Sequence, residues 1–425
     1  MTDITDNIIE QRKRILSPSL SLSYNEPLHI IRGRRQYLYD ADGNEFLDAT
    51  NNIQHVGHSH PKVVEATLRQ LKRLNTNTRY LDKTILDYAS LLIQKMPNEL
   101  NKVFFTNSGS ESNDLALRLA RNFLQNNETI VLDGAYHGHL ISLIEVSPYK
   151  YKGPGGITPP ENVHELPIPD PYRGKHRGEN SGRKYAEEMN TILKKVKVPP
   201  TFLSESIMGC GGQLIPPEGF MKKAYDLVKA SDGLCIADEV QIGFGRMGDV
   251  FWGFESQNVV PDIVSLGKSI GNGHPLSVVI TTKEIADRFN NGMEYFNSYG
   301  GNPVSCAIGK AVLEIIEEEE LQKNAREVGI RLLKMLQELE KRHEHIGDVR
   351  GKGLFLGIEI MEGSDYSQPS KEIATLIVNK MKESGILVST DGPDHNVIKI
   401  KPPMVFNFQN ACQLTETLDS ILLKI

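Results

Sequence analysis

The sequence predicts an α/β protein with a large domain built on a mostly parallel β-sheet and a second, smaller α/β domain. From about residue 62, helical patterns alternate with short apolar runs. These runs are continuously apolar, which is typical of strands covered on both faces of a sheet. After Gly301 the chain changes to long helical patterns followed by further strand-like runs. Strands separated by helices need crossover connections, so most of the sheet should be parallel.

The first sixty residues are predicted to hold a short helix and a β-hairpin. Residues 1–16 place acidic side chains early and basic ones late, as the dipole of a helix favours. Residues 37–50 contain two strand-like runs around Asp42-Gly43, a frequent hairpin turn. The predicted division of the chain is an N-terminal segment joining the smaller domain (1–60), a large domain (61–310) and the C-terminal part of the smaller domain (311–425).

The large domain is expected to alternate helices and strands. Helical periodicity runs through residues 60–74 and 110–123. Six apolar runs have the length of strands: 102–107, 129–133, 201–206, 233–240, 262–267 and 276–282. Residues 150–185, rich in Gly, Pro and basic side chains, are predicted to be one long irregular segment, which is usually a functional or disordered feature.

The C-terminal part is expected to begin with two long helices in residues 305–342. Strand-like runs at 351–360 and 395–406 follow, and a helical pattern over residues 370–385 joins them.

Composition excludes several classes of function. The formal net charge of −6 argues against nucleic acid or an anionic membrane as the main partner. No run approaches the ~18 apolar residues of a membrane span, and residues 1–16 lack the apolar centre of a signal peptide. The four cysteines lie far apart without a CxxC pair, which favours free thiols in a reducing compartment. We therefore expect a soluble, cytoplasmic protein.

Polar residues follow three of the predicted strands at the position where each strand ends. They are Ser108-Gly109-Ser110, Asp238 and Lys268. Ligands of parallel sheets bind at the carboxyl ends of the strands. Gly109 and Ser110 begin a predicted helix, whose free N–H groups and dipole favour a phosphate group. The alternative at this position is an ordinary N-cap by Ser108 or Ser110.

Lys268 is unusual because lysine is seldom buried without a partner. Asp238 could serve as the counter-ion of a protonated ring nitrogen, or it could pair with Arg246. Tyr136, in "DGAYHGH", could stack on a planar ligand or be a core aromatic. A phosphate cradle, a carboxylate, a stacking ring and a buried lysine are together what pyridoxal phosphate requires, with Lys268 forming the Schiff base.

The order of four short motifs resembles the class III aminotransferase family of fold-type I pyridoxal-phosphate enzymes. The motifs are SGS (108–110), YHG (136–138), DEVQ (238–241) and GK (267–268). The resemblance spans roughly residues 20–420 and implies a seven-stranded sheet in the large domain and a homodimer or a dimer of dimers. It also implies that Lys268, Asp238 and Tyr136 are catalytic.

The same resemblance implies how the cofactor is held. Gly109 and Ser110 would bind the phosphate, Tyr136 would stack on the ring, and Asp238 would bind the ring nitrogen. Gln241 would contact the 3-hydroxyl, Lys268 would carry the cofactor, and Ser298 would reach the phosphate from the neighbouring subunit. Glu205 matches an acidic residue on the substrate side.

Seven stretches resemble a narrower subgroup, the phospho-lyases that act on ethanolamine phosphate or 5-phosphohydroxylysine. They are "NNIQHVGHSHPKVV", "LNTNTRYL", "AYHGHLISLIEVSPYKY", "PDPYRGKHR", "ESIMGCGGQLIPPEGF", "GNGHPL" and "YGGNPVSC". This implies elimination of phosphate from a phosphorylated amine, leaving an aldehyde and ammonia. Lys268 would remove the proton, and Asp238 would keep the ring nitrogen protonated. A class III ω-transaminase and a non-catalytic cofactor-binding protein stay open as alternatives.

One departure from the family pattern bears on the substrate. Many class III aminotransferases carry an arginine shortly before a Pro-Pro pair near the C-terminus, where it clamps a carboxylate. Here the stretch is "KIKPPM", with Lys399 and Lys401 instead. Lysine is a poorer fork for carboxylate but serves for phosphate. Arg79, Lys399 and Lys401 are therefore the candidate ligands of the substrate phosphate.

Two further motifs are assigned no role. "GFGRMG" (243–248) fits the GxGxxG pattern, but "DVFWGF" follows instead of a helix. His55, His58 and His60 lie close in sequence without a Cys or carboxylate nearby to complete a set of zinc ligands. No metal site is predicted.

Overall fold

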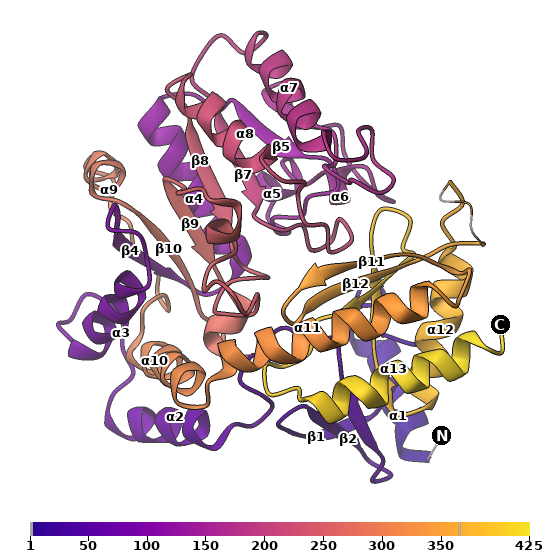
Figure 1. The fold of residues 1–425 in the computed structure, drawn as a ribbon. Helices are drawn as coiled ribbons and strands as arrows, with labels where there is room; N and C mark the ends of the chain where they lie inside the picture. The colour runs from indigo at the N-terminus through magenta and orange to yellow at the C-terminus, as the bar shows by residue number, and fades with distance from the viewer. Residues whose placement is uncertain (1–2, 364, 366) are drawn as a thin grey trace.

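The computed structural model describes residues 3–363, 365 and 367–425. The chain forms a large α/β domain and a smaller domain that carries both chain termini (Figure 1). No helix among these described residues is long and apolar enough to cross a membrane.

The large domain is built on a seven-stranded mixed sheet, in the order β4-β10-β9-β8-β7-β5-β6. Its strands are β4 (Leu100–Thr106), β5 (Thr129–Leu132), β6 (Val163–Leu166), β7 (Thr201–Glu205), β8 (Leu234–Asp238), β9 (Ile263–Leu266) and β10 (Ser277–Thr282). β10 alone among them runs antiparallel to its neighbours β4 and β9. Residues 267–276, which join β9 to β10, are too few for the helical crossover of about a dozen or more residues that a parallel pair needs. The predicted fold class is confirmed.

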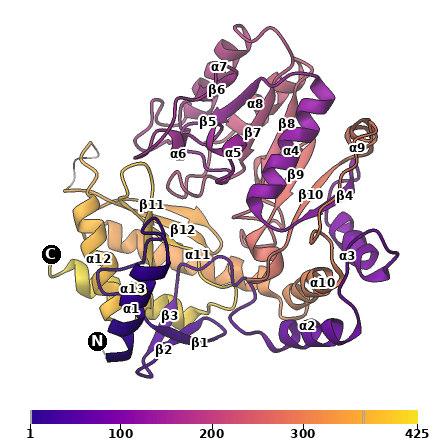
Figure 2. The ribbon, with the colours of Figure 1, turned by 180° about the vertical axis from the view of Figure 1, so that it is seen from behind.

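Both faces of this sheet are covered, which explains why its strands are continuously apolar. Successive residues of a strand belong to different apolar clusters, such as Ile130 and Val131 of β5 or Phe202 and Leu203 of β7. Helix α8 (Phe220–Lys229) covers one face, and α4 (Gly109–Leu124) crosses β9 and β10 on the other (Figure 2).

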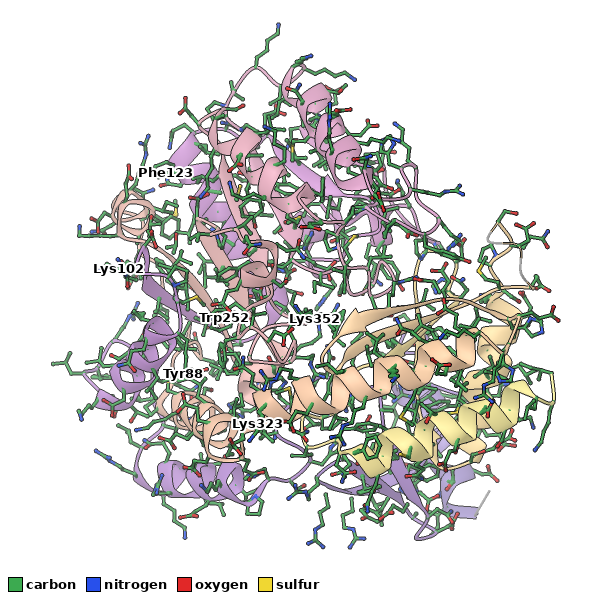
Figure 3. All side chains as sticks on the ribbon, viewed as in Figure 1. Tyr88, Lys102, Phe123, Trp252, Lys323 and Lys352 are labelled. Atoms are coloured by element: carbon green, nitrogen blue, oxygen red, sulfur yellow. The ribbon has the colours of Figure 1, made fainter. Side chains whose placement is uncertain are left out.

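The remaining helices of the large domain connect its strands or flank the sheet. They are α2 (Pro61–Arg73), α3 (Lys83–Gln94), α5 (Ile141–Ile144), α6 (Pro148–Tyr151), α7 (Ser181–Leu193), α9 (Lys283–Phe289) and α10 (Pro303–Glu318), with 3-10 turns η1 (Gly253–Gln257) and η2 (Lys268–Gly271). Tyr88 of α3 is buried against Gly309 of α10, where a Cβ would collide with its ring (Figure 3).

The smaller domain contains a four-stranded sheet in the order β11-β12-β15-β14. Its elements are α11 (Leu321–Glu340), β11 (Ile346–Lys352), β12 (Phe355–Ile360), α12 (Lys371–Glu383), β14 (Ser389–Asp391), β15 (Val397–Ile400) and α13 (Phe408–Leu422). The two long helices predicted within residues 305–342 are α10 and α11, which separate at Glu319 and Glu320.

A third sheet joins the two ends of the chain. After α1 (Asp3–Ile15), it contains β1 (Ile30–Arg34), β2 (Tyr37–Asp40), β3 (Glu45–Asp48) and β13 (Ile386–Leu387). The hairpin expected around Asp42-Gly43 is formed by β2 and β3. β13 pairs in parallel with β3, so the N-terminal hairpin extends a strand that comes from the C-terminal segment.

Three predictions for local structure are wrong. Residues 150–185 are not one irregular segment, because they include β6 and the start of α7. Residues 351–360 are not a single strand, because Gly353 turns the chain with φ 58° between β11 and β12. Within residues 395–406 only β15 is a strand, since Pro402 and Pro403 lack the N–H groups of a ladder.

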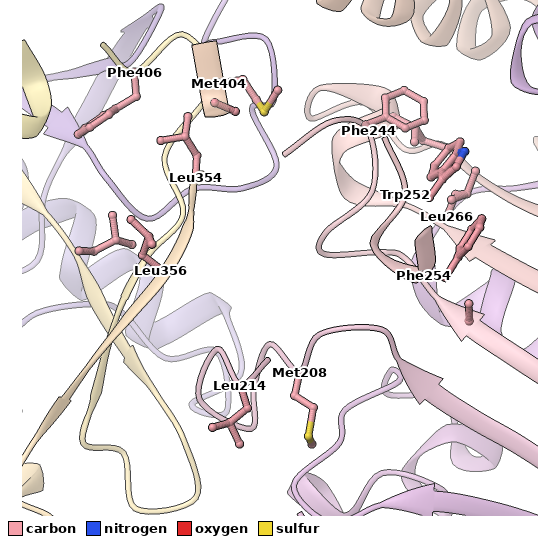
Figure 4. Packing of buried hydrophobic residues seen from close by; sticks show 14 of the residues in the cluster. Met208, Leu214, Phe244, Trp252, Phe254, Leu266, Leu354, Leu356, Met404 and Phe406 are labelled. Carbon is pink, nitrogen blue, oxygen red and sulfur yellow. The ribbon is translucent and has the colours of Figure 1, made fainter. Parts of the chain in front are cut away.

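One apolar cluster runs through both domains. Phe244, Trp252 and Leu266 of the large domain belong to the same cluster as Leu354 and Phe406 (Figure 4). Because packed interiors transmit small shifts, this shared core makes the position of one sheet depend on the other. The carboxyl ends of the large sheet face this junction.

Candidate active site

The candidate site lies where β4, β8 and β9 end at the same edge of the large sheet. A cavity of about 120 Å³ is located there. Its lining consists of Ser108, Gly109, Ser110, Asn113, Tyr136, His137, Gly138, Asp238, Val240, Gln241 and Lys268. The structure thus brings together six of the residues predicted to bind the cofactor: Gly109, Ser110, Tyr136, Asp238, Gln241 and Lys268.

The N-terminus of α4 forms one wall of the cavity. Ser108 is the N-cap, and its hydroxyl accepts a hydrogen bond of 3.2 Å from the N–H of Glu111. The N–H groups of Gly109 and Ser110 have no acceptor among the described residues. A Cβ on Gly109 would come within 2.9 Å of Val240 Cγ1, so glycine is required there. The capping interpretation holds for Ser108, and the two following N–H groups are left for an anion.

Asp238 is buried at the end of β8 with three hydrogen bonds. Its Oδ2 accepts from Asn113 Nδ2 and from His137 Nδ1, both at 2.8 Å, and its Oδ1 accepts from the N–H of Val240 at 3.1 Å. The alternative pairing with Arg246 is wrong. Arg246 is buried elsewhere and donates to the carbonyls of Leu354 and Pro402, and burial lowers its pKa to about 9.

Sequence reasoning missed Asn113 and His137. Asn113 lies one helical turn after Gly109 on α4, and His137 follows Tyr136 directly. Their positions relative to these two residues could therefore have identified both as part of the site. His137 Nε2 and Asn113 Oδ1 are buried without a hydrogen-bond partner within the described chain. Buried polar atoms normally have partners, so these two indicate that the site is completed by a ligand.

Lys268 has a backbone conformation that is costly for its residue type. Its φ is 40°, in the left-handed region, directly after the strand β9. Its amine makes no hydrogen bond or ion pair with any residue that the structure describes. Such strain is found at sites where function requires it. Gly267 precedes it, where a Cβ would lie 3.3 Å from the backbone of Gly109.

Tyr136 is half-buried at the wall of the cavity, so its interpretation as a core aromatic is wrong. Its ring packs edge-on against Tyr149 at 6.1 Å, and Lys150 Nζ lies 5.5 Å from its centroid. Burial raises the pKa of its hydroxyl, which therefore stays protonated at neutral pH.

Glu205 does not line the cavity. It is buried at the end of β7, in register with Asp238 of β8. Its Oε1 accepts a 3.0 Å hydrogen bond from the N–H of Gly209, and Oε2 lacks a partner among the described residues. Burial raises the pKa of Glu205 to about 7, so this carboxyl can be protonated near neutrality and avoid a second charge beside Asp238.

The four remaining candidates lie outside the cavity in this single chain. Lys401 is sealed in the interior, and Lys399 lies nearby with a quarter of its side chain exposed. Both lysines pair with Asp391, at 3.1 and 3.0 Å respectively. Arg79 is exposed and pairs with Glu294 at 2.9 Å. Ser298 is exposed in the loop before α10.

Two larger cavities adjoin the site. One, of about 520 Å³, is lined by Tyr149 and Lys150 beside Tyr136 and by His395 of the smaller domain. The other, of about 410 Å³, is lined by Lys399 and by Asn52, whose amide donates to Gln241 at 3.3 Å. Space for a substrate is therefore present near the site on two sides.

The two motifs that were assigned no role, the three histidines and "GFGRMG", have structural roles. His55, His58 and His60 contact Phe244 O, Asp48 and Glu319 respectively. No group of three potential metal ligands occurs within the part of the chain that the structure describes. In "GFGRMG", Gly245 and Gly248 have φ values of 78° and 80° and form turns.

The residues of the cavity fit pyridoxal phosphate. Unpaired N–H groups at a helix N-terminus suit its phosphate, a buried carboxylate suits its ring nitrogen, and an unpaired amine suits its aldehyde. The buried atoms His137 Nε2 and Asn113 Oδ1, which lack partners among the described residues, fit a polar ligand in this cavity.

Comparison with known proteins identifies the family, while the relatives carry two kinds of names. The aminotransferase class-III family model matches residues 21–422. A Drosophila melanogaster protein named alanine–glyoxylate aminotransferase 2-like is 49% identical over 95% of this chain and 84% of its own length. The Caenorhabditis elegans ethanolamine-phosphate phospho-lyase homolog 1 is 40% identical over 98% of this chain and 93% of its own. A solved phospholyase from Arthrobacter in complex with phosphoethanolamine is 36% identical with a TM-score of 0.92, covering 98% of this chain and 100% of that one.

Proposed function

This chain belongs to the class III aminotransferase family of pyridoxal-phosphate enzymes, and we propose that it is a phospho-lyase that eliminates phosphate from a phosphorylated amine. The substrate class is an amine with a phosphate ester on the neighbouring carbon, such as O-phosphoethanolamine or 5-phosphohydroxylysine. With water, such an amine gives an aldehyde, ammonia and inorganic phosphate. No keto acid is consumed.

The observation that carries this proposal is the surplus positive charge next to the cofactor cavity. Lys399 and Lys401 share the single carboxylate of Asp391, so one positive charge is in excess when both lysines are protonated; burial lowers the pKa of Lys401, and Asp391 opposes that shift. Lys401 also contacts Gln241 of the cavity wall. An excess cation at this position suits a substrate that brings a second phosphate in addition to that of the cofactor.

The chain's own residues supply acid–base chemistry around the cofactor, which acts as an electron sink when bound. The free amine of Lys268 would take the proton from the carbon that bears the substrate nitrogen. Asp238, whose carboxylate is held by Asn113 and His137, would bind the protonated ring nitrogen. With a phosphate ester on the adjacent carbon, the electron pair of the broken C–H bond would form a carbon–carbon double bond while the C–O bond breaks and phosphate leaves with its electrons.

Lys399 is the favoured ligand of the substrate phosphate within one subunit, because it lines the cavity of about 410 Å³ beside Asn52. Lys401 is a weaker candidate than the sequence indicated, since both Asp391 and Gln241 already engage its amine. Arg79 would have to release Glu294 and act across a subunit boundary.

A second candidate function, aminotransfer to a keto acid, is favoured by the 49% identity to a protein named as an aminotransferase. A non-catalytic role is less well supported, because the cavity keeps both Asp238 and an unpaired Lys268.

The test is a product balance on the holoenzyme. Incubated with O-phosphoethanolamine or 5-phosphohydroxylysine and no keto acid, the protein should release phosphate and ammonia in equal amounts. Lys399→Met should weaken substrate binding by about 10- to 100-fold, as loss of a charged hydrogen bond predicts, without releasing cofactor. If neither phosphoamine yields phosphate while pyruvate-dependent amine transfer is fast, the chain is an aminotransferase.

We further propose that the chain acts as a homodimer in which the loop carrying Ser298 completes the partner's site. The segment 79–86 contacts this loop through its first residue, Arg79, which pairs with Glu294 and lies over the ring of Phe296. The two segments together expose the large apolar residues Tyr80, Leu81, Leu86, Met293 and Tyr299. Soluble proteins seldom leave such a patch uncovered.

Sedimentation should show a dimer, and Leu81→Asp should shift it toward monomer with loss of bound cofactor. Ile31→Asp is the matched control, since Ile31 is also exposed but lies on β1 of the third sheet. A fully active monomer would refute the proposal.

A further inference from the structure

Gln241 is held in one orientation by two donors. Its side-chain oxygen accepts from Lys401 Nζ at 3.1 Å and from Asn52 Nδ2 at 3.3 Å. Its nitrogen meets only the weak acceptor Cys210 Sγ, at 3.8 Å. Turning the amide over would place its NH2 group against an ammonium and a second amide NH2. The N–H end of Gln241 is therefore the end without a strong acceptor among the described residues, and Gln241 lines the cavity.

Lys401 is itself fixed from several sides. Its side chain is 2% exposed, and its amine donates to Asp391 Oδ2 at 3.1 Å and lies 4.8 Å from the centre of the Phe355 ring. Gln213 Nε2 donates to the same Asp391 oxygen at 2.8 Å. Burying a lysine is unfavourable unless its charge is compensated, so this arrangement is retained at a cost in stability. The burial makes Lys401 an internal support rather than a group that meets substrate.

We propose that Lys401 is a positioning residue for the cofactor: it fixes the amide of Gln241 so that its N–H end faces the cavity. Asn52 assists from the N-terminal segment. The cofactor's environment then depends on the smaller domain, because Lys401 directly follows β15 and Asp391 ends β14. This role is independent of whether the reaction is elimination or aminotransfer.

Lys399 provides a matched control within the same cluster. It pairs with the other oxygen of Asp391 at 3.0 Å, and no contact with Gln241 is formed by it within the described residues. Removal of either lysine deletes one positive charge near Asp391. An effect on the cofactor that is specific to Lys401 therefore cannot be a general effect of charge.

The experiment compares holoenzymes of Lys401→Met, Lys399→Met, Gln241→Met and the double variant Lys401→Met/Gln241→Met. The readouts are the dissociation constant of pyridoxal phosphate and its visible absorbance maximum. Lys401→Met should weaken retention of the cofactor by about tenfold, the effect of one hydrogen bond, and shift the maximum. Lys399→Met should do neither. In the Gln241→Met background, Lys401→Met should add nothing further, because its effect passes through that amide.

Additive effects of the two substitutions would overturn the proposal, as would equal effects of Lys401→Met and Lys399→Met. So would a Lys401→Met variant with normal cofactor binding and absorbance but a raised KM, because Lys401 would then act on substrate. If Lys401→Met fails to fold because Asp391 loses one of its two lysine partners, Asp391→Asn/Lys401→Met removes both members of that buried pair. That variant should show the same cofactor defect, and normal cofactor binding and absorbance in it would refute the role.

Discussion

Replacing Lys268 with alanine should lower the turnover rate by at least about 10²–10⁴-fold, the contribution typical of a general base. Among the residues described, Lys268 carries the one side-chain amine in the lining of the cavity. That amine forms no hydrogen bond or ion pair with any of these residues. The visible absorbance that depends on a covalent bond to Lys268 should be lost. Stopped-flow measurement of the rate and an absorbance spectrum of the purified variant provide the check.

Whether Lys268→Ala loses activity because its fold is damaged can be tested separately. Lys268 makes no hydrogen bond within the described residues that alanine would remove, so the melting temperature of the cofactor-free forms should be unchanged. A small exogenous amine should restore part of the rate, because it replaces the missing base. Lys283→Ala, which removes an exposed lysine at the start of α9, is the control and should behave as wild type. Normal turnover by Lys268→Ala would exclude Lys268 as the base.

The cofactor could be predicted from the sequence because its candidate residues follow strands directly, and the family because four short motifs resemble it. The fold class followed from the alternation of helices and strands. Gly109, Asp238 and Lys268 are far apart in sequence, but parallel strands place their carboxyl ends at one edge of a sheet. That rule required no knowledge of side-chain packing. The comparisons confirm the family and the cofactor.

The predictions that were wrong depend on tertiary contacts, which the sequence does not show. β6 is an edge strand whose half-exposed His164 and Glu165 interrupt the apolar run, so no strand was predicted. Arg246 was close to Asp238 in sequence, but it is buried against carbonyls of the smaller domain. For Lys401, the sequence does not show the pairing with Asp391 of the neighbouring strand β14, and its role toward the substrate phosphate stays a prediction.

Asp238→Asn should retain the cofactor but lower the rate of proton removal by roughly 10²–10⁴-fold. Leaving a buried charge without its partner costs about 3–5 kcal/mol, and each 1.36 kcal/mol is tenfold in rate. An amide cannot balance the charge of the ring nitrogen. The amide also cannot accept hydrogen bonds from all three donors that Asp238 has now. In one orientation its NH2 group would face the N–H of Val240, and in the other it would face the donors of Asn113 and His137.

The measurement is the single-turnover rate with substrate deuterated at the carbon that bears the nitrogen. In Asp238→Asn the isotope effect should be fully expressed, because proton removal becomes the slow step. Asp287→Asn, an exposed aspartate on α9, should leave rate and isotope effect unchanged. An Asp238→Asn enzyme with a normal rate and a bound cofactor of normal absorbance would show that charge at this position is dispensable. The ring nitrogen would then have to find its counter-charge at another carboxyl, and Glu205, in register with Asp238 on the next strand, would be the residue to substitute next.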